Sequence, residues 1–307
     1  MKVVSVNISE KKGTIKHPVD KIILNDKGVE GDAHAGYWIR QVSMLGAESI
    51  ERFSKQVKRK INFGELAENI TTEGFDVYKS NILDRFETKN VILEVTQIGK
   101  KCHGDRCAIF REVGTCVMPK EGIFCRVIKG GEVKADDEII YKPKIFKAAV
   151  ITLSDRASRG EYDDLSGPKV IEFLEKYFIE EKREFENSYK LIPDDANQLK
   201  KLLEDFTNKN FDFIFTTGGT GIGSKDITVD VTKPMLHKEI PGIMEFIRYK
   251  YGSEKPNALI SRSVAGLINK TMIFTLPGSV KAVNEYMTEI LKSLNHLVLM
   301  LHEIDSH

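Results

Sequence analysis

Four short apolar runs in the second half of the chain end in the same kind of residue. Small, acidic or glycine residues follow each run: Ser154 and Asp155, then Asp194, then Thr217, Gly218, Gly219, Thr220 and Gly221, and finally Pro277 and Gly278. Glycine permits positive φ and leaves backbone N–H groups open, so a segment such as 218–223 can hold an anion. These residues predict a phosphate-binding site.

Asp226 follows the glycine segment closely. A carboxylate beside a phosphate is electrostatically unfavourable unless a cation lies between them, and Mg²⁺ bridging Asp226 and a nucleotide phosphate would remove that conflict. The segment is not a P-loop, because Ser224 precedes Lys225 where that motif needs lysine directly after glycine. Structural alternatives stay open: a tight turn without ligand for the glycines, a helix cap for Asp226, and a turn residue for Asp194.

Nucleotidyl transfer needs little more than this set, because it rests on positioning and on neutralising phosphate charge. A metal-holding carboxylate and a phosphate nest suffice, and nothing in this half stands out as a covalent nucleophile. Arg262 can add a bidentate phosphate contact, although an arginine after a loop is more often a solvated structural residue.

The elements that must position these residues alternate between strand and helix after residue 145. Such alternation is typical of an α/β domain with a mostly parallel sheet and helices on both faces. In open parallel sheets, ligands bind outside the carboxyl ends of the strands, so the four loops are expected to converge on one pocket.

The first half follows another pattern, with short extended runs broken by glycine. We expect a β-rich, barrel-like domain with helical decoration, in which a helix over about 44–57 covers an open side of the sheet. The polar, proline-containing stretch 141–144 separates the halves. The predicted domains are therefore 1–143 and 146–307.

All four cysteines lie in the first half, at Cys102, Cys107, Cys116 and Cys125. Their spacing does not match the paired CxxC motifs of structural zinc sites, and disulfides are rare in a reducing compartment. Small buried thiols are the plain alternative for each of them. His34 and His103 are candidate ligands, although an isolated histidine is usually only hydrogen-bonded.

Charge and hydropathy exclude several classes of protein. With 46 basic and 45 acidic residues, the net charge of +1 gives no electrostatic footprint for nucleic acid or an anionic membrane. The N-terminus lacks a signal-peptide pattern, and no apolar run reaches the ~18 residues of a membrane span. We expect a cytoplasmic protein without nucleic-acid or membrane partners.

Seven segments stand in order across the second half: ITLSDRAS at 151–158, LIPDD at 191–195, TTGGTG at 216–221, DIT at 226–228, EIPG at 239–242, SRSVAG at 261–266 and LPG at 276–278. Through them, residues 146–307 resemble the MogA-type molybdopterin adenylyltransferases, a family shared with the G domain of gephyrin. The family often has proline where this chain has Val229 and Ser279, which puts loop rigidity in doubt.

This resemblance implies that Asp194 and Asp226 are the functional pair in transfer of AMP from Mg-ATP to molybdopterin, with Asp226 holding the Mg²⁺. It implies that Ser154 and Asp155 line the pterin side. It implies further substrate-binding residues at the loop segments: Thr217, Gly218, Gly219, Thr220, Gly221, Ser261, Arg262, Pro277 and Gly278. It also implies a homotrimer formed through the C-terminal domain.

Three segments of the first half, GVEGDAHAG at 28–36, GELAENITTEG at 64–74 and IGKKCHGDRCAIF at 98–110, resemble a MOSC domain. In that family a cysteine near 102–107 is proposed to carry sulfur or bind molybdenum. We select Cys107, with Cys102 as the alternative, because basic neighbours such as Lys100 and Arg106 would favour a thiolate.

Together the two resemblances predict a protein of molybdenum cofactor assembly with ATP, Mg²⁺ and molybdopterin as ligands, molybdenum as a further candidate ligand, and other assembly proteins as partners. A non-catalytic molybdopterin carrier or scaffold is one alternative. A molybdenum oxidoreductase role for the first domain is another.

Overall fold

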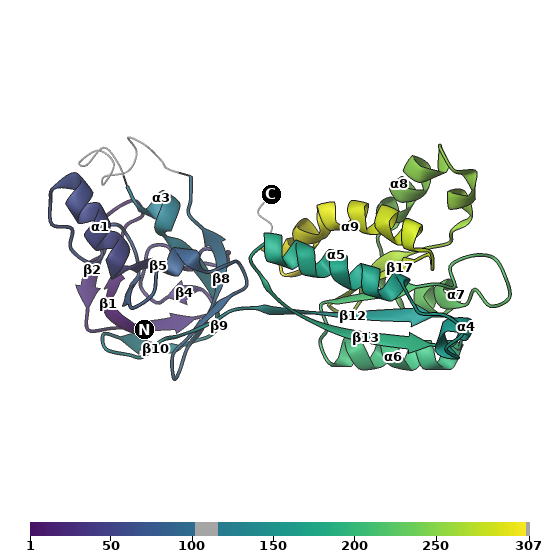
Figure 1. Ribbon diagram of the computed structural model, residues 1–307. Helices are drawn as coiled ribbons and strands as arrows, with labels where there is room; N and C mark the ends of the chain where they lie inside the picture. Colours follow the sequence, from purple (N-terminus) through teal and green to yellow (C-terminus); the bar gives the residue numbers. More distant parts are fainter. Residues whose placement is uncertain (102–115, 305–307) are drawn as a thin grey trace. The chain divides into compact units, whose positions relative to one another are not determined.

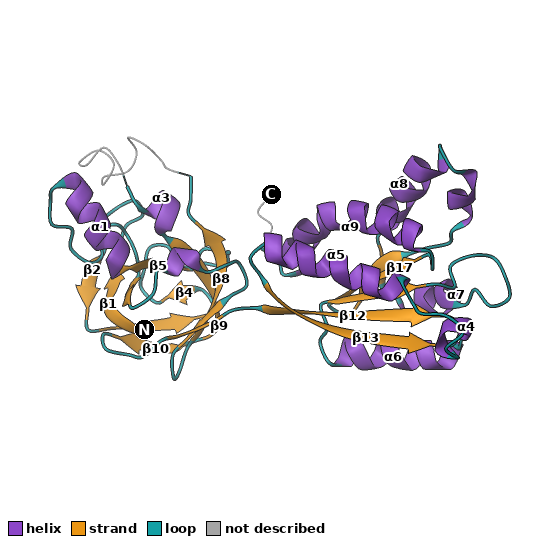
Figure 2. Ribbon diagram, in the orientation of Figure 1, coloured by secondary structure: helices purple, strands orange, loops and turns teal. Residues whose placement is uncertain are grey.

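The computed structural model describes residues 1–101 and 116–304, so the predictions for Cys102, His103 and Cys107 lie outside the described residues. Contacts within the chain divide it into two compact units, Met1–Lys144 and Ile145–His307. Each unit has its own sheets and helices (Figures 1 and 2).

The N-terminal unit contains an eight-stranded sheet in the order β11-β7-β8-β9-β5-β6-β1-β2 and a three-stranded sheet in the order β10-β3-β4. The first is built from β1 (Lys2–Ile8), β2 (His17–Val19), β5 (Val42–Gly46), β6 (Ile70–Glu73), β7 (Arg85–Glu87), β8 (Ile92–Ile98), β9 (Ile123–Lys129) and β11 (Ile140–Lys142). The second is built from β3 (Lys21–Asn25), β4 (Gly28–Val29) and β10 (Gly131–Lys134). Within the described residues both sheets are open, so the β-rich prediction holds but a closed barrel is not confirmed.

The core of this unit lies between the two sheets, where Val6 and Ile70 of the large sheet join the same apolar cluster as Leu24 and Val133 of the small one. The predicted helix is present as α1 (Ala47–Val57). It begins three residues later than expected because 44–46 belong to β5. Its Ile50 and Phe53 pack on the other face of the sheet. Short helical segments follow at η1 (Val77–Lys79) and α3 (Met118–Glu121).

The C-terminal unit has one six-stranded sheet in the order β13-β12-β14-β17-β16-β15. Its strands are β12 (Ile145–Leu153), β13 (Glu184–Ile192), β14 (Phe213–Thr217), β15 (Lys238–Glu239), β16 (Ala265–Ile268) and β17 (Thr271–Leu276). The first four in sheet order are parallel, whereas β16 pairs antiparallel with β17 and β15 pairs antiparallel with β16. The predicted mostly parallel sheet is confirmed.

Helices cover both faces of this sheet, with α5 (Ser166–Glu180) and α9 (Val280–Leu301) on one face and α6 (Ala196–Asn208) on the other (Figure 1). Alternate residues of β12 therefore face opposite layers. Ile151 packs in the α6 cluster, whereas the ring of Phe146 stacks on Phe178 of α5 at 5.3 Å. Burial on both faces explains why residues 148–153 are apolar except for Thr152.

The remaining helices lie in loops that follow strands: α4 (Asp155–Ser158), α7 (Thr228–Thr232), η3 (Lys233–Met235), α8 (Pro241–Gly252) and η4 (Pro256–Ile260). Among the described residues, no helix is both long enough and apolar enough to cross a lipid bilayer.

Candidate functional site

The strand order brings the predicted site residues to one edge of the C-terminal sheet. From β12 the chain passes through α5 to β13 on one side, then through α6 to β14 on the other side. Such a reversal leaves a crevice at the carboxyl ends of the strands, where α/β sheets bind ligands. The loops after β12, β13, β14 and β17 all begin at this edge.

Asp155 and Asp194 tie the ends of β12 and β13 together. The N–H of Asp155 donates to Oδ2 of Asp194 at 3.0 Å, and the N–H of Asp194 donates to Oδ1 of Asp155 at 3.1 Å. Burial raises the pKa of Asp194, and the negative charges of Asp155 and Asp226 raise it further. The capping role at α6 belongs to Asp195, whose Oδ1 accepts from Gln198 N–H at 2.8 Å.

The glycine loop allows three strand ends to approach closely. Gly218 has φ of +94° and donates its N–H to the carbonyl of Leu276 at 3.0 Å. A Cβ on Gly218 would lie 2.3 Å from the carbonyl oxygen of Leu153, and a Cβ on Gly278 would lie 3.2 Å from the Cα of Gly218. Any larger residue at 218 would therefore push β12 and β14 apart.

Asp226 lies against this loop. Its Oδ2 accepts from the N–H of Gly223 at 2.8 Å and lies so near Gly221 that a Cβ there would be 2.7 Å away. The helix-cap alternative is not seen, because α7 has Ile227 at its N-cap and no side-chain cap. Thr228 fixes the loop by donating from Oγ1 to the carbonyl of Gly218 at 2.8 Å.

Lys225 was missed by the sequence analysis, which used it only to reject a P-loop. Its Nζ forms an ion pair with the carboxylate of Asp155, and its side chain is 73% exposed. This hydrogen-bonded ion pair holds the pKa of Asp155 below its usual value. The pair joins the glycine loop to the end of β12 across the crevice.

Arg262 is held by the loop as well. Its Nε donates to the carbonyl of Gly221 at 2.6 Å, and its Nη2 donates to the carbonyl of Asp226 at 2.7 Å. Both Nη atoms also pair with the carboxylate of Asp230, at 2.7 and 3.0 Å. Arg262 thus fastens the loop, and its phosphate contact stays a prediction.

Ser261, the other predicted residue of this segment, also contacts the glycine loop. Oγ of Ser261 lies 3.5 Å from Oγ1 of Thr220 and 2.9 Å from Oγ of Ser263. The structure therefore brings the 261–263 segment and the glycine loop together.

Asp164 is a second residue of the site that the sequence did not single out. It accepts hydrogen bonds from Tyr189 OH and Thr152 Oγ1, both at 2.7 Å, and from Ser166 Oγ at 2.7 Å. Burial alone would raise its pKa, but these hydrogen bonds outweigh burial and lower the pKa. Since Ser166 also bonds to Thr217 at 2.7 Å, Asp164 orders the hydroxyl groups at the end of β14.

An open cavity of about 240 Å³ lies beside this network, lined by Thr152, Leu153, Ser154, Tyr162, Asp163, Asp164, Leu165, Ser166, Gly278 and Val280. Two predicted substrate-binding residues, Ser154 and Gly278, thus line it directly. Ser154 also bonds through Oγ to Tyr162 OH at 2.8 Å. Thr217 lies one hydrogen bond behind the wall, through Ser166.

The carboxylates at this edge suit a cation that arrives with its own ligands. In residues 1–101 and 116–304, no three acidic, histidine or cysteine side chains converge as a complete metal site. Burial raises the pKa of Asp194, and the like charges of Asp155 and Asp226 add to the shift, so a cation near Asp194 and Asp226 would stabilise the charged forms. Mg²⁺ is usually bound by one or two carboxylates together with substrate phosphates, so the donor set fits.

The N-terminal unit has a separate pocket of about 110 Å³, lined by His34, Trp38, Arg40, Ser43, Ala67, Asn69, Lys100 and Phe124. Its two cations lie over its two aromatic rings. The Arg40 guanidinium is 4.9 Å from the ring centroid of Trp38, and Nζ of Lys100 is 5.7 Å from that of Phe124. A small pocket with two cations and several hydrogen-bonding groups suits an anion.

Cys125 is a structural cysteine of the N-terminal core. Cys125 is fully buried in β9, with its Sγ 3.7 Å from Sδ of Met44. Burial strongly raises the pKa of its thiol. The buried structural alternative is therefore confirmed for Cys125.

The comparisons with known proteins separate the same two halves. The family described as "Probable molybdopterin binding domain" matches residues 149–296, and the family described as "MOSC domain" matches residues 31–140.

Curated relatives match the C-terminal half. A molybdopterin adenylyltransferase of Helicobacter pylori strain J99 is 35% identical over 150 residues, which cover 48% of this chain and 84% of that protein. A molybdenum cofactor biosynthesis protein B of Staphylococcus aureus strain MRSA252 is 39% identical over 165 residues, covering 52% and 91%. Gephyrin of Dictyostelium discoideum is 33% identical over 159 residues, covering 50% of this chain but 22% of gephyrin.

A solved structure of the molybdopterin biosynthesis enzyme MoaB from Thermus thermophilus shares 33% identity, with 52% of this chain and 97% of that one aligned at a TM-score of 0.47. The bacterial relatives are covered over most of their length, and a second family matches the other half. The chain therefore belongs to the family of MoaB, MogA and gephyrin-type molybdopterin-binding proteins of molybdenum cofactor biosynthesis, here joined to a MOSC domain.

Proposed function

We propose that the C-terminal unit is a molybdopterin adenylyltransferase, which transfers AMP from ATP to the terminal phosphate of molybdopterin. A phosphate oxygen of molybdopterin attacks the α-phosphorus of ATP, and the bond to the β-phosphate breaks. Pyrophosphate leaves with the bonding electrons, and adenylyl-molybdopterin remains. The name of the Helicobacter pylori relative supports this reaction.

The observation that carries the proposal is the position of Asp226 against a glycine loop, with Asp194 close enough to feel its charge. When bound with the nucleotide, Mg²⁺ would neutralise charge on the phosphates and on these carboxylates. Asp226 and Asp194 would hold that ion. The loop N–H groups at 219–221 would bind phosphate oxygens.

The remaining residues would position the two substrates. Ser154 and Asp155 would line the pterin side, where Ser154 and Gly278 both border the cavity. Pro277 would set the turn that presents Gly278. Lys225 would offset phosphate charge from the exposed side of the loop.

We propose that the N-terminal unit binds a molybdenum- or sulfur-bearing form of the same cofactor, with Cys107 as its reactive residue and Cys102 as the alternative. The MOSC family match and the cationic pocket support this role. Such a unit would take up the product of the C-terminal unit or a later form of it. The homotrimer, the cytoplasmic location and contacts with other assembly proteins remain predictions.

The test is Asp226→Asn, assayed as pyrophosphate release from ATP with Mg²⁺ and molybdopterin. We expect a loss of at least ~100-fold, since removing one charge-stabilising group costs on the order of 3 kcal/mol in the transition state. Molybdopterin should still bind. Asp205→Asn serves as the matched control, because Asp205 forms an exposed ion pair with Lys209 on α6.

Nearly unchanged pyrophosphate release by Asp226→Asn would refute the assignment of Asp226. If the wild-type chain binds molybdopterin but releases no pyrophosphate, the carrier or scaffold alternative is correct. A stoichiometric molybdenum content with redox activity would instead support the oxidoreductase alternative for the N-terminal unit.

A further inference from the structure

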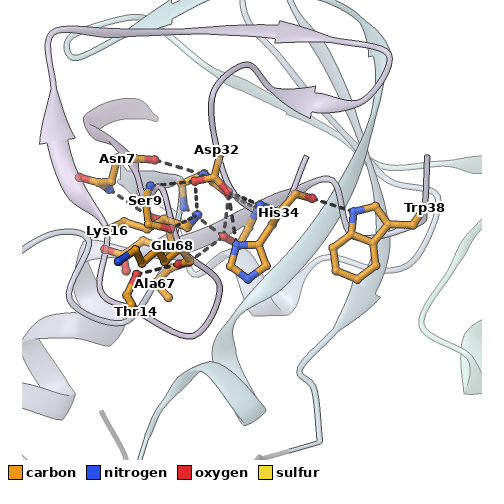
Figure 3. Close-up of polar contacts among 12 residues, drawn as sticks. Asn7, Ser9, Thr14, Lys16, Asp32, His34, Trp38, Ala67 and Glu68 are labelled. Carbon is orange, nitrogen blue, oxygen red and sulfur yellow. Dashed lines mark hydrogen bonds and ion pairs between the residues drawn. The ribbon is translucent and has the colours of Figure 1, made fainter. Parts of the chain in front are cut away.

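A buried charged cluster (Figure 3) contacts His34 and Asn69, two residues that line the pocket of the N-terminal unit. The side chains of Lys16 and Asp32 are each 1% exposed and form an ion pair. Oδ2 of Asp32 also accepts from the N–H of Ser9 at 3.0 Å and from Nδ2 of Asn69 at 3.2 Å. A buried pair of this kind is costly unless its remaining hydrogen bonds are made, as they are here.

Asp32 is kept ionised by these contacts. Burial alone would raise the pKa of Asp32, but its interactions with His34 and Lys16 outweigh burial and hold the pKa well below its usual range. A buried carboxylate that stays charged has a fixed set of partners, because every donor to it is itself held in place. Asp32 therefore acts as a rigid acceptor behind the pocket.

His34 connects this acceptor to the pocket. Oδ1 of Asp32 accepts from the N–H of His34 at 2.9 Å and lies 3.3 Å from Nδ1 of its ring. The His34 side chain is 30% exposed and lines the pocket. The carbonyl of His34 accepts from Nε1 of Trp38 at 2.9 Å, which restrains the backbone that carries the ring.

A carboxylate facing Nδ1 holds a proton on that nitrogen, so the N–H at Nε2 of an imidazolium is left for an anionic ligand. Among the described residues, the other charged groups that line the pocket are Arg40 and Lys100. Two cations repel a bare metal ion but attract an anion. We propose that His34 binds an oxoanion through Nε2, and that Asp32, held by Lys16, is the positioning residue that orients the ring.

This inference rests on the proposed role of the N-terminal unit and specifies its chemistry. The ligand group would be either a phosphate monoester or an oxometalate, which share tetrahedral oxygens and negative charge. Protonated at both nitrogens, the imidazole would donate from Nε2 to one such oxygen while Nδ1 faces Asp32. Arg40 and Lys100 would supply further positive charge.

The test measures binding of sodium molybdate and of inorganic phosphate to the full chain by titration calorimetry. His34→Gln should weaken binding by about 10- to 100-fold, the range expected for a hydrogen bond to a charged group. Preference for molybdate would identify an oxometalate site, and preference for phosphate a monoester site. Binding that is absent from the wild type, or unchanged in His34→Gln, would overturn the proposal.

The positioning role needs a separate variant, because Asp32→Asn alone leaves the charge of buried Lys16 without a partner. The double variant Lys16→Met with Asp32→Asn removes both charges at similar volume. We expect it to fold, to lose the Nδ1–H form of His34 in side-chain ¹⁵N spectra, and to bind the anion about 10-fold more weakly. The exposed pair Lys21 and Glu132, replaced by methionine and glutamine, is the matched control.

These measurements test the positioning role of Asp32, the anion site and the function of the unit separately. If the double variant keeps wild-type spectra and affinity, Asp32 does not position His34. If the anion binds through His34 but the chain carries no molybdenum or sulfur form of the cofactor, the proposed function of this unit fails while the anion site stands.

Discussion

Replacing Glu68 by glutamine should remove a pH-dependent loss of stability from the N-terminal unit. Glu68 is fully buried, and its Oε1 accepts from the N–H of Gly64 at 2.6 Å and from Thr71 Oγ1 at 3.1 Å. Its Oε2 has no hydrogen-bond partner. Burial raises the pKa of Glu68 from 4.5 to about 7.

The direction of the pH dependence follows from the pKa values of Glu68 in the unfolded and the folded chain. Between pH 4.5 and about 7 the folded chain keeps a proton that the unfolded chain has released, so the free energy of unfolding falls as pH rises. This contribution is fully present below pH 4.5 and is lost above about pH 7. The difference between the two pKa values corresponds to about 3 kcal/mol, since each pKa unit is worth about 1.4 kcal/mol.

Glutamine keeps the Oε1 acceptor and cannot ionise. Its Nε2 would stand where Oε2 has no partner, at a cost of about 1–3 kcal/mol that does not vary with pH. The difference in unfolding free energy between wild type and Glu68→Gln should therefore change by about 3 kcal/mol from pH 4.5 to pH 8, in favour of the variant.

Urea unfolding at a series of pH values measures this difference. Trp38 is the single tryptophan of the chain and lies in the N-terminal unit, so its fluorescence reports the unit that contains Glu68. The exposed residue Glu73 provides the control, because Glu73→Gln should follow the wild-type pH dependence. Parallel profiles for wild type and Glu68→Gln would show that the buried carboxyl does not titrate in this window.

Three further changes test the C-terminal unit. Gly218→Ala should lower adenylyl transfer at least ~100-fold and destabilise the unit by about 2 kcal/mol, because its Cβ would lie 2.3 Å from the Leu153 carbonyl oxygen at a positive φ; wild-type kinetics and melting temperature would contradict the strain argument. Lys225→Met should raise KM for ATP by roughly 10-fold with a smaller effect on kcat, Lys225→Arg should recover most of it, and Lys209→Met should change nothing; an unchanged KM would leave Lys225 with only its ion pair to Asp155. Asp164→Asn should destabilise the unit by about 2 kcal/mol in calorimetry through its weakened hydrogen bonds, and no loss would mean that the network is dispensable.

The sequence was most informative where local pattern and burial coincide. The run 148–153 predicted a strand covered on both faces, and the structure buries it between α5 and α6. The residues that follow each parallel strand lie at one edge of the sheet, because neighbouring parallel strands have their carboxyl ends at the same edge. Helix α1 was predicted by its spacing, and its start was misjudged because 44–46 are apolar enough for either element.

Contacts between distant residues gave no such signal. Lys225 and Asp155 are 70 residues apart, and Lys16 stands in a polar, lysine-containing segment that reads as an exposed loop. Lys16 is nevertheless buried against Asp32. Long-range ion pairs depend on the packing of whole elements, which neither periodicity nor spacing encodes. The barrel-like arrangement is not confirmed for a related reason, since alternation predicts strands but not whether a sheet closes.

The carboxylates of the two units divide by how well their charge is stabilised. Asp164 and Asp32 each accept several hydrogen bonds from held side chains, and their pKa values lie below the usual range. The pKa of Asp194 is instead raised, chiefly by burial and further by the charges of Asp155 and Asp226. A carboxylate that orients other groups needs a complete set of hydrogen-bond donors, because it has to stay ionised. A carboxylate whose charge is destabilised gains most from a cation, which is why Asp194, within electrostatic range of Asp226, fits the role of binding Mg²⁺ with the nucleotide better than Asp164 does.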